Sequence, residues 1–390
     1  MKIRSQRIQH VVQSDIRAMT QACDKVGGVN LGQGICDLPA PDVVKLGAQN
    51  AIDQDLNTYS RFDGEAAFRT QVANKLRVYN KVDYNPENEI VATIGASGAL
   101  TSTLHALTDP GDEIIVFEPS YGYHLHACAL AGVVTKTVTL RAPDFAIDID
   151  AVARQITPKT RAILVNTPSN PSGKVFTRAE LEAIAELCIA HDILCITDEI
   201  YEYIIYDGRE HISMASLPGM KERTILISGF SKTFSITGWR IGFAAAPQEF
   251  ALAIGLLGDL FSICAPTPLQ HGVAHALETL PAAHYQDMSN HYERVRNQLC
   301  DVLDEVGLTA IRPQGAYYVL CDTSRLKAPT ARDAAMQILH EAGVAGVPGS
   351  AFFSGNEGDQ LIRFCYAKQQ HHIDEACERL RTWGRALSKA

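Results

Sequence analysis

The sequence predicts an α/β protein in which helices cover both faces of a mainly parallel sheet, forming three layers, with a smaller α+β domain beside it. Over roughly residues 45–290, short apolar runs alternate with longer segments of helical period. Such alternation is typical of parallel strands joined by helices. Several of the runs are almost entirely Val, Ile, Leu and Ala, as expected for strands that are buried on both faces.

The large domain is therefore expected to span residues 45–290. Its candidate strands are residues 89–95, 113–118, 133–140, 162–166, 193–200, 224–229 and 241–246. Helical patterns lie between them at residues 98–108, 177–192 and 248–261. Thr177 followed by Glu180 predicts a capping box at the start of the second of these helices.

The chain changes character after about residue 290. Helical patterns cover residues 289–307 and 331–343, candidate strands cover residues 315–322 and 360–367, and a last helix follows. Few strands among more helices predict a smaller α+β domain. We expect this domain to comprise residues 1–44 and 291–390, because the N-terminal segment is too short to fold alone.

Composition excludes several classes of protein. The chain has 390 residues, 46% of them hydrophobic, and a formal net charge of −9 without a basic block. This balance argues against nucleic acid or an anionic membrane as a partner. The first residues lack the apolar core of a signal peptide, and no apolar run could span a bilayer. Ten scattered cysteines without a C-x-x-C pair indicate reduced, buried thiols and a cytoplasmic protein.

Polar and Gly-rich signatures directly follow the predicted strands. Ligands of α/β sheets bind beyond the carboxyl ends of the strands, so these positions are informative. Gly95-Ala96-Ser97-Gly98 lies between a strand and a helix, where backbone N–H groups can receive an anion. The loop at residues 166–173 contains two prolines and a glycine and would hold Asn170 in a fixed direction. A plain structural turn would also explain either signature.

Four charged residues complete the set. Asp198 ends an apolar strand, where a carboxylate needs a cationic partner, either an arginine or a protonated ring nitrogen. Lys232 and Arg240 follow another strand among small and apolar residues; burial there makes a lysine a better nucleophile. Arg363 lies on an apolar strand and suits bidentate binding of a carboxylate. Pyridoxal phosphate needs a lysine, an acid for its ring nitrogen and an anion site, and an amino acid substrate needs the second arginine.

Longer motifs match a known family. The chain resembles the class I/II aminotransferases of fold type I, the aspartate aminotransferase superfamily, and most nearly the kynurenine/glutamine–phenylpyruvate transaminase group. The matching segments span almost the whole chain: VNLGQG (29–34), VATIGASGALTSTLHALTDPGDEIIVFEP (91–119), NTPSNPSGKVFTRAELE (166–182), CITDEIYEYIIYDGREHISMASLPGM (195–220), SKTFSITGWRIGF (231–243), PQGAYYVL (313–320) and LIRFCYAK (361–368).

The resemblance implies pyridoxal 5′-phosphate as the cofactor and a role for each matching residue. Lys232 is similar to the lysine that forms the Schiff base, and Asp198 to the partner of the pyridine nitrogen. Tyr201 and Asn170 resemble the residues that hydrogen-bond the cofactor's phenolic oxygen. Tyr121 stands where an aromatic ring stacks on the pyridine.

The remaining assignments concern the phosphate, the neighbouring subunit and the substrate. The phosphate site is expected to comprise Arg240, Ala96, Ser97 and Ser231. Tyr59 resembles the tyrosine that reaches the phosphate of the neighbouring subunit, which implies a homodimer with shared active sites. Gly34 and Arg363 resemble the substrate-binding pair, with Arg363 holding the α-carboxylate.

Three departures from the kynurenine-type pattern count against an aromatic amino acid as substrate. Ser97 stands where a tyrosine is common, and Ile35-Cys36-Asp37 replaces a Phe-Pro-Asp run. The segment near Ile16 has no aromatic residue to wall such a pocket.

The expected reaction is transamination between an L-amino acid and a 2-oxo acid. Enzymes of this fold with the same lysine, aspartate and arginine also perform elimination, γ-replacement or carbon–carbon bond formation, so a lyase or a related enzyme of specialised metabolism is the alternative. A cofactor-sensing regulator is disfavoured because the domain begins near residue 1, leaving no room for a DNA-binding module. A nicotinamide dehydrogenase is disfavoured because no G-x-G-x-x-G fingerprint is present.

Overall fold

The structure is a computed structural model that describes residues 15–387. Its centre is a seven-stranded sheet in the order β2-β8-β7-β6-β5-β3-β4. Strands β7, β6, β5, β3 and β4 are parallel neighbours, and β8 pairs antiparallel with both β7 and β2. Each strand coincides with one of the seven predicted apolar runs, so the mainly parallel sheet is confirmed. The strands are β2 (Ile90–Ile94), β3 (Glu113–Glu118), β4 (Val134–Thr139), β5 (Thr160–Asn166), β6 (Leu194–Asp198), β7 (Thr224–Gly229) and β8 (Ile241–Ala245).

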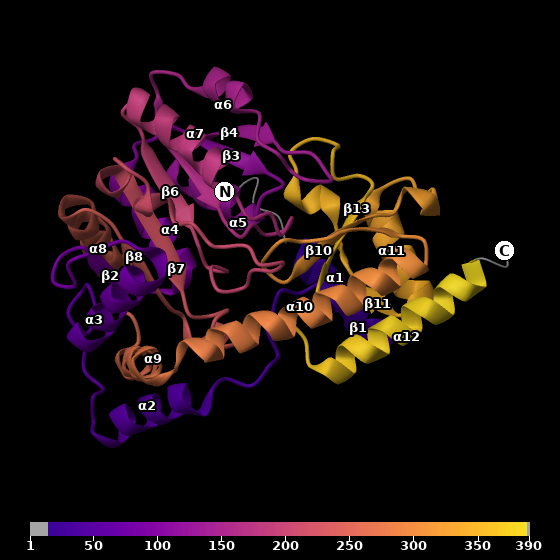
Figure 1. Cartoon of the computed structure of the whole chain (residues 1–390), viewed down its shortest axis with the longest axis horizontal. Coiled ribbons are helices and arrows are strands. Elements are labelled where there is room, and N and C mark those ends of the chain that lie inside the picture. The colour runs from indigo at the N-terminus through magenta and orange to yellow at the C-terminus, as the bar shows by residue number, and fades with distance from the viewer. Residues whose placement is uncertain (1–14, 388–390) are drawn as a thin grey trace, which may run out of the picture.

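Helices cover both faces of this sheet, as predicted (Figure 1). Ile114 and Val116 of β3 pack in one apolar cluster with α4, α5 and α8, whereas Ile115 and Phe117 pack on the other face with α6 and α7. Alternate residues of a strand point to opposite faces, so a continuous apolar run requires two helical layers. The helices around this sheet are α2 (Asp42–Asp53), α3 (Ala66–Lys75), α4 (Gly95–Leu107), α5 (Gly122–Ala131), α6 (Ile149–Gln155), α7 (Arg178–Ala190), α8 (Gln248–Ser262) and α9 (Thr267–Thr279).

The capping box predicted at the start of α7 is present. The Thr177 hydroxyl accepts a hydrogen bond from the Glu180 backbone N–H, and the Glu180 carboxylate accepts one from the Thr177 N–H. The predicted helices near residues 98–108 and 248–261 correspond to α4 and α8.

A second apolar core joins the two ends of the chain. Met19 and Cys23 pack in one cluster with residues of the C-terminal helices and strands. A four-stranded antiparallel sheet, β12-β13-β10-β9, and a parallel pair, β1-β11, lie here. The elements of this part are α1 (Asp15–Val26), β1 (Val29–Asn30), β9 (Thr309–Ile311), β10 (Tyr318–Asp322), α11 (Ala331–Ala342), β11 (Val344–Ala345), β12 (Val347–Pro348), β13 (Leu361–Cys365) and α12 (Gln370–Leu387).

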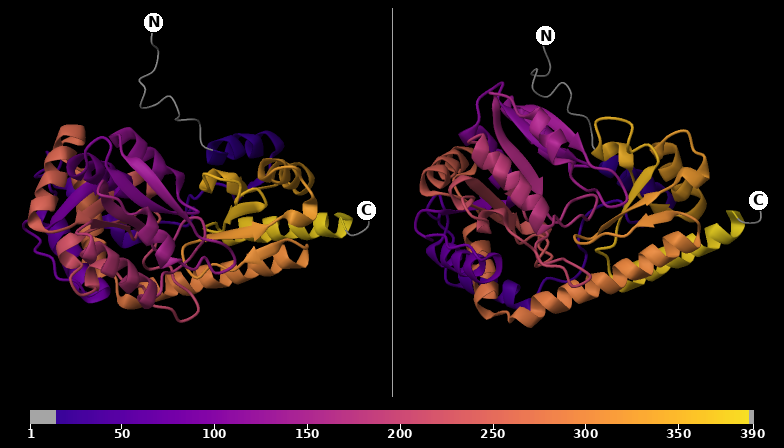
Figure 2. Two further views of the ribbon diagram at one scale, coloured as in Figure 1. Left: turned by 90° about the horizontal axis from the view of Figure 1, so that it is seen from above. Right: turned by 45° about the horizontal axis from the view of Figure 1, so that its top comes forward.

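One long helix connects the two parts. Figure 2 shows α10 (Ala282–Glu305) running without interruption from the layers around the large sheet to the C-terminal elements. The expected domain edge at residue 290 falls inside this helix, and the edge at residue 45 falls inside α2. The division into residues 45–290 and residues 1–44 with 291–390 stays a prediction, and residues 1–14 of it lie outside the described chain.

Two further observations bear on the expectations from composition. No helix between residues 15 and 387 is long and apolar enough to cross a membrane. All ten cysteines are free, and all but Cys264 are buried, as the scattered spacing predicted. The absence of a signal peptide was predicted from residues that mostly precede residue 15 and so lie outside the described chain.

Candidate active site

A cavity of about 490 Å³ lies at the carboxyl ends of the parallel strands. Asn166 and Asp198, the last residues of β5 and β6, both line it. Of the twelve site residues predicted from the sequence, eleven line this cavity. These eleven are Gly34, Ala96, Ser97, Tyr121, Asn170, Asp198, Tyr201, Ser231, Lys232, Arg240 and Arg363.

Tyr59 is the exception, since it lies outside the cavity of its own chain. It follows α2 in a loop and its side chain is 76% exposed. The predicted role of Tyr59 requires a second subunit, so this placement leaves that prediction open.

Lys232 lies three residues beyond β7, in a turn that points its amine into the cavity. Its Nζ donates a hydrogen bond to the Gly34 carbonyl oxygen at 3.1 Å. The pKa of Lys232 is lowered to about 8, mainly because burial removes water from its ammonium. The positive charges of nearby Arg240 and Arg363 also lower this pKa. An appreciable fraction of the amine is therefore unprotonated near neutral pH, as a nucleophile for carbonyl carbon requires.

Asp198 is paired with a histidine that the sequence analysis did not identify. Asp198 Oδ2 lies 2.9 Å from Nε2 of His124, which is buried at the start of α5. Tyr121 packs edge-on against His124 with ring centroids 5.5 Å apart. Within the described residues Asp198 is thus paired with an imidazole and not with an arginine, and its pairing with a ring nitrogen stays a prediction. The remaining Asp198 oxygen, Oδ1, accepts a hydrogen bond from the Ile200 N–H at 3.2 Å.

A candidate anion site lies at the start of α4. Arg240 donates to the Ser97 hydroxyl at 2.9 Å and to the Thr237 carbonyl at 2.9 Å, and makes no ion pair within residues 15–387. Gly95 has a φ of +67°, and a Cβ there would collide with the Arg240 guanidinium. The glycine therefore allows an arginine to lie against a helix N-terminus, where backbone N–H groups attract anions.

Arg363 is a second cation that has no carboxylate partner among residues 15–387. Its side chain is buried, with Nη1 donating to Asn170 Oδ1 at 2.9 Å and Nη2 donating to the Gly32 carbonyl at 2.7 Å. In the part of the chain that the structure describes, its Nε has no hydrogen-bond partner. The guanidinium lies over the Tyr318 ring, with its central carbon 4.3 Å from the ring centroid. A buried positive charge with an unused donor is costly until an anionic ligand pairs with it.

Two hydrogen bonds fix the loop that carries Asn170. Asn166 Oδ1 accepts from the Asn170 N–H at 2.8 Å, and Asn166 Nδ2 donates to the Asp198 carbonyl at 2.9 Å. Asn166 thus ties the loop to the end of β6 and positions Asn170 beside Arg363. The sequence analysis placed Asn166 at the start of the loop and gave it no role.

Gly34 and Tyr201 meet at Tyr318. Tyr201 OH lies 3.0 Å from Tyr318 OH, and burial raises the pKa of Tyr201 well above its ordinary value. A Cβ on Gly34 would collide with the Tyr318 hydroxyl, so this position admits only glycine. The Tyr318 contact could not be found from sequence because β10 and the segment after β1 are distant in the chain.

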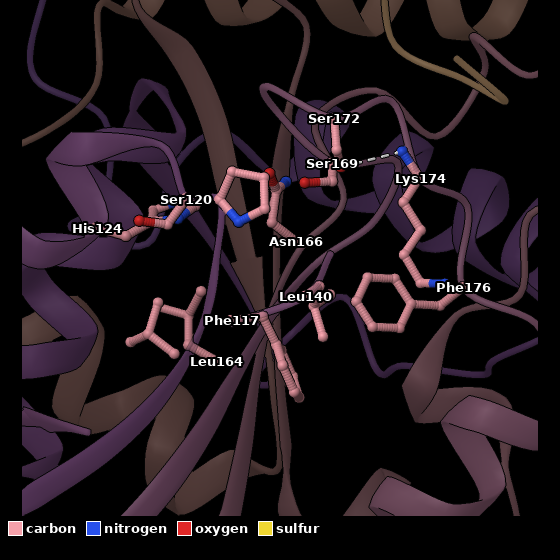
Figure 3. A pocket seen from close by; sticks show the side chains of 12 residues that line it. Phe117, Ser120, His124, Leu140, Leu164, Asn166, Ser169, Ser172, Lys174 and Phe176 are labelled. Carbon is pink, nitrogen blue, oxygen red and sulfur yellow. Dashed lines mark hydrogen bonds between the residues drawn. The ribbon is translucent and has the colours of Figure 1, made fainter. Parts of the chain in front are cut away.

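A small pocket shares His124 and Asn166 with the main cavity (Figure 3). Its volume is about 10 Å³, roughly the space for one water molecule, so no substrate can bind there. The Ser120 hydroxyl lines it and has no hydrogen-bond partner among the described residues. The larger cavity is therefore the candidate site of chemistry.

Comparison with known proteins shows the family to which the chain belongs. The model of the family "Aminotransferase class I and II" matches residues 26–380. Aromatic-amino-acid aminotransferase 2 of Thermococcus litoralis is 35% identical over 381 residues, which are 96% of this chain and 97% of that protein. Human kynurenine--oxoglutarate transaminase 1 is 33% identical over 388 residues, covering 91% of this chain and 92% of that protein.

The solved structure of N-succinyldiaminopimelate aminotransferase from Mycobacterium tuberculosis superposes with a TM-score of 0.94 at 34% identity, covering 97% of this chain and all of the other. At 97% coverage of this chain, the match extends through both parts of the molecule. The chain belongs to the class I and II aminotransferases, and it is a pyridoxal-phosphate-dependent enzyme of fold type I.

Proposed function

We propose that this aminotransferase carries pyridoxal phosphate on Lys232 and exchanges the amino group of an L-amino acid with a 2-oxo acid in the cavity at the ends of β5 and β6. The observation that carries the proposal is the convergence of four groups in one cavity. They are a lysine with a pKa of about 8, a carboxylate fixed by histidine, an anion site at α4 and a buried arginine without a carboxylate.

The residues present fit the cofactor. Arg240, the Ser97 hydroxyl and the first N–H groups of α4 would hold the phosphate, because Arg240 has no carboxylate partner among the described residues. Ser231 also lines this cavity and would add a hydroxyl. Asp198 would face the ring nitrogen, and Tyr121 would lie on the ring.

The mechanism follows from what each side chain can do. Pyridoxal phosphate, when bound, supplies an aldehyde carbon for the amino group and a ring that withdraws electrons from the substrate. Arg363 binds the α-carboxylate and so orients the Cα–H bond. Lys232 removes the Cα proton as a general base, because its amine is unprotonated over a useful range of pH. Asp198, held in place by its hydrogen bond with His124, would face the ring nitrogen and favour its protonated form.

Transamination is favoured over the lyase or replacement alternative by the family and by the relatives, which are named as aminotransferases. A closer relation to the kynurenine/glutamine–phenylpyruvate transaminases is part of the proposal and rests on the shared sequence segments. Ser97, Ile35 and Ile16 all line the cavity, and none of them provides an aromatic wall. These three side chains support a non-aromatic substrate.

We also propose a homodimer with shared active sites. Tyr59 is highly exposed, and the outer face of α8 presents Leu252, Leu256 and Leu260 to solvent, with Leu260 80% exposed. A hollow of about 370 Å³ at the end of α8 is lined by Phe261 and also by Ser97 of the anion site. A second copy that covers this apolar surface would approach the phosphate site, as the predicted role of Tyr59 requires.

The reaction is tested by mixing the holoenzyme with a panel of amino acids and measuring both the 2-oxo acid and the amino form of the cofactor by mass. We expect both products from wild type and from Lys159→Ala, an exposed lysine outside the cavity. Lys232→Ala should lose the reaction by a factor of at least about 10³, since the base is removed. Full activity of Lys232→Ala would refute the assignment, and loss of a leaving group without a change of cofactor form would favour the lyase.

A further inference from the structure

The cavity contains one cation that the proposed function does not use. Four of its lining residues are Arg or Lys: Arg17, Lys232, Arg240 and Arg363. Lys232 is assigned to the cofactor, Arg240 to the phosphate and Arg363 to the α-carboxylate. Arg17 has no role in that scheme, and its guanidinium makes no hydrogen bond or ion pair to any other residue between 15 and 387.

Arg17 is held at the cavity by the packing of α1. Met19 and Cys23 on the same helix are buried in the core shared with the C-terminal elements, and Figure 2 shows α1 lying against that part. The Thr20 hydroxyl donates to the Ile16 carbonyl at 2.9 Å and accepts from Asn30 Nδ2 at 3.2 Å, which joins the helix to β1. Asp15, the nearest acidic residue in sequence, is paired with Arg332 at 3.2 Å and leaves Arg17 unneutralised.

The wall that carries Arg17 borders the reacting groups. Ile16, Gln33 and Ile35 line the same cavity, and Gly34, between the last two, accepts the hydrogen bond from Lys232. A substrate bound by its carboxylate to Arg363 and by its amine near Lys232 would therefore extend its side chain along this wall.

The charges around the cavity select the kind of side chain that fits. Asp198 is the one acidic residue among those that line it within the described chain, and its carboxylate is engaged by His124. A substrate side chain that ends in an ammonium or guanidinium would be repelled by Arg17 and would find no free carboxylate to bind. A distal anion would find an unpaired guanidinium, which suits carboxylates through its planar fork.

We propose that Arg17 determines specificity by binding a second, distal acidic group, so that the preferred amino donor or 2-oxo acid acceptor is a dicarboxylic acid. This inference rests on the proposed function, in which Arg363 takes the α-carboxylate. Because Arg17 is exposed, the preference for dicarboxylic substrates weakens as ionic strength rises.

The test compares isosteric substrates with wild type and three variants of the holoenzyme. The ratio of kcat/KM for glutamate to that for glutamine, and for aspartate to asparagine, is measured for Arg17→Gln, Arg17→Lys and Arg17→Glu. We expect wild type to favour the acid of at least one pair, and Arg17→Gln to lower that ratio by about tenfold or more. Arg17→Lys should restore part of the ratio, and Arg17→Glu should favour the amide. Lys25→Gln, which removes an exposed cation from the same helix outside the cavity, should leave the ratio unchanged.

A binding measurement separates this inference from the proposed function. Calorimetric titration measures the binding of succinate and glutarate to the protein and compares it with the binding of butyrate and valerate, which lack the second carboxylate. None of these acids needs to be turned over. Tighter binding of the dicarboxylates that is lost in Arg17→Gln supports the inference even if no amino acid reacts. Equal binding of both kinds of acid, or an unchanged glutamate-to-glutamine ratio in Arg17→Gln while transamination proceeds, overturns the inference and leaves the aminotransferase assignment intact.

Discussion

At the scale of single residues, the proposed chemistry depends on two arginines that have no carboxylate partner among residues 15–387. Arg363 is buried with one unused donor, and Arg240 lies against a helix N-terminus that also attracts anions. A positive charge without an anionic partner costs free energy, and binding of an anionic ligand offsets this cost. Lys232 shows the opposite consequence of burial, since its ammonium is destabilised and its reactive amine is favoured.

The lowered pKa of Lys232 predicts how the cofactor-free chain captures pyridoxal phosphate as pH changes. Only the unprotonated amine attacks the aldehyde, and burial lowers the pKa of Lys232 to about 8. The capture rate should therefore rise with pH and level off above a pH of about 8, whereas an ordinary lysine would still gain rate up to its pKa of about 10.4. Stopped-flow absorbance gives this rate, and a midpoint near 10 would show that Lys232 is not desolvated.

The charged and glycine positions of the site could be predicted from sequence because each stands out from its surroundings. Lys232, Asp198 and Arg363 follow or interrupt apolar runs, where a charge must have a purpose. His124 could not be found in this way. It lies at the start of an ordinary helix, and only the arrangement of β3 and β6 in one sheet brings it to Asp198. Arg17 is equally inconspicuous, since an arginine on an amphipathic helix is usually a solvated residue.

At the scale of elements, the strands of the large sheet were predictable and the smallest strands were not. Runs such as residues 113–118 and 224–229 have an uninterrupted apolar centre, at residues 114–117 and 225–227, and form β3 and β7 with the same bounds. Strands β1 and β11 contain two residues each, and they pair Val29 with Val344 across most of the chain. Two residues carry no periodicity, so only the packing of α1 on the C-terminal elements defines them.

A buried ionic cluster next to the site stabilises the elements around it. The π-helical turn η2 (Leu76–Asn80) follows α3 and directs Asn80 toward Glu202. Asn80 Nδ2 donates a hydrogen bond to Glu202 Oε2 at 2.8 Å. Lys75 Nζ lies 2.5 Å from the Glu202 carboxylate, and both side chains are almost fully buried. Burial opposes ionisation of Glu202, but the charge of Lys75 and the hydrogen bonds outweigh it, so the pKa of Glu202 is lowered.

Removing the cation from this cluster should strongly destabilise the fold. Lys75→Met leaves the Glu202 carboxylate buried without its partner, and we expect unfolding in urea to show a loss of about 3–5 kcal/mol. The double variant Lys75→Met, Glu202→Gln should regain part of that loss. Because the folded-state pKa of Glu202 is lowered, its contribution is present above the unfolded-state value and is lost as pH falls through the folded one. A single variant as stable as wild type would contradict this account of the cluster.

At the scale of the whole molecule, the two parts of the chain line different sides of the cavity in which we propose that the substrate binds. The large sheet provides Asp198 and Lys232 and the anion site, whereas Arg17, Gly34 and Arg363 come from the part that joins both ends of the chain. Helix α10 connects these parts (Figure 1). The predicted homodimer would add a third contribution, from Tyr59 of the second copy.

The apolar face of α8 gives the dimer a direct test. Leu260→Asp places a charge in the centre of the proposed contact and should convert a dimer of about twice 42.5 kDa to a monomer, measured by light scattering. Cofactor affinity should fall as well, because the second copy borders the phosphate site. Val134→Asp, on β4 at the opposite edge of the sheet, is the matched control. A wild-type monomer with full cofactor affinity would exclude shared active sites.

The most direct measurement of the central proposal is reduction of the holoenzyme with borohydride, followed by digestion and mass mapping of the peptides. The account predicts that the vitamin B6 label is found on the peptide containing Lys232 and is absent from that peptide in Lys232→Ala. A label on a different lysine, or a chain that takes up no pyridoxal phosphate, would contradict it.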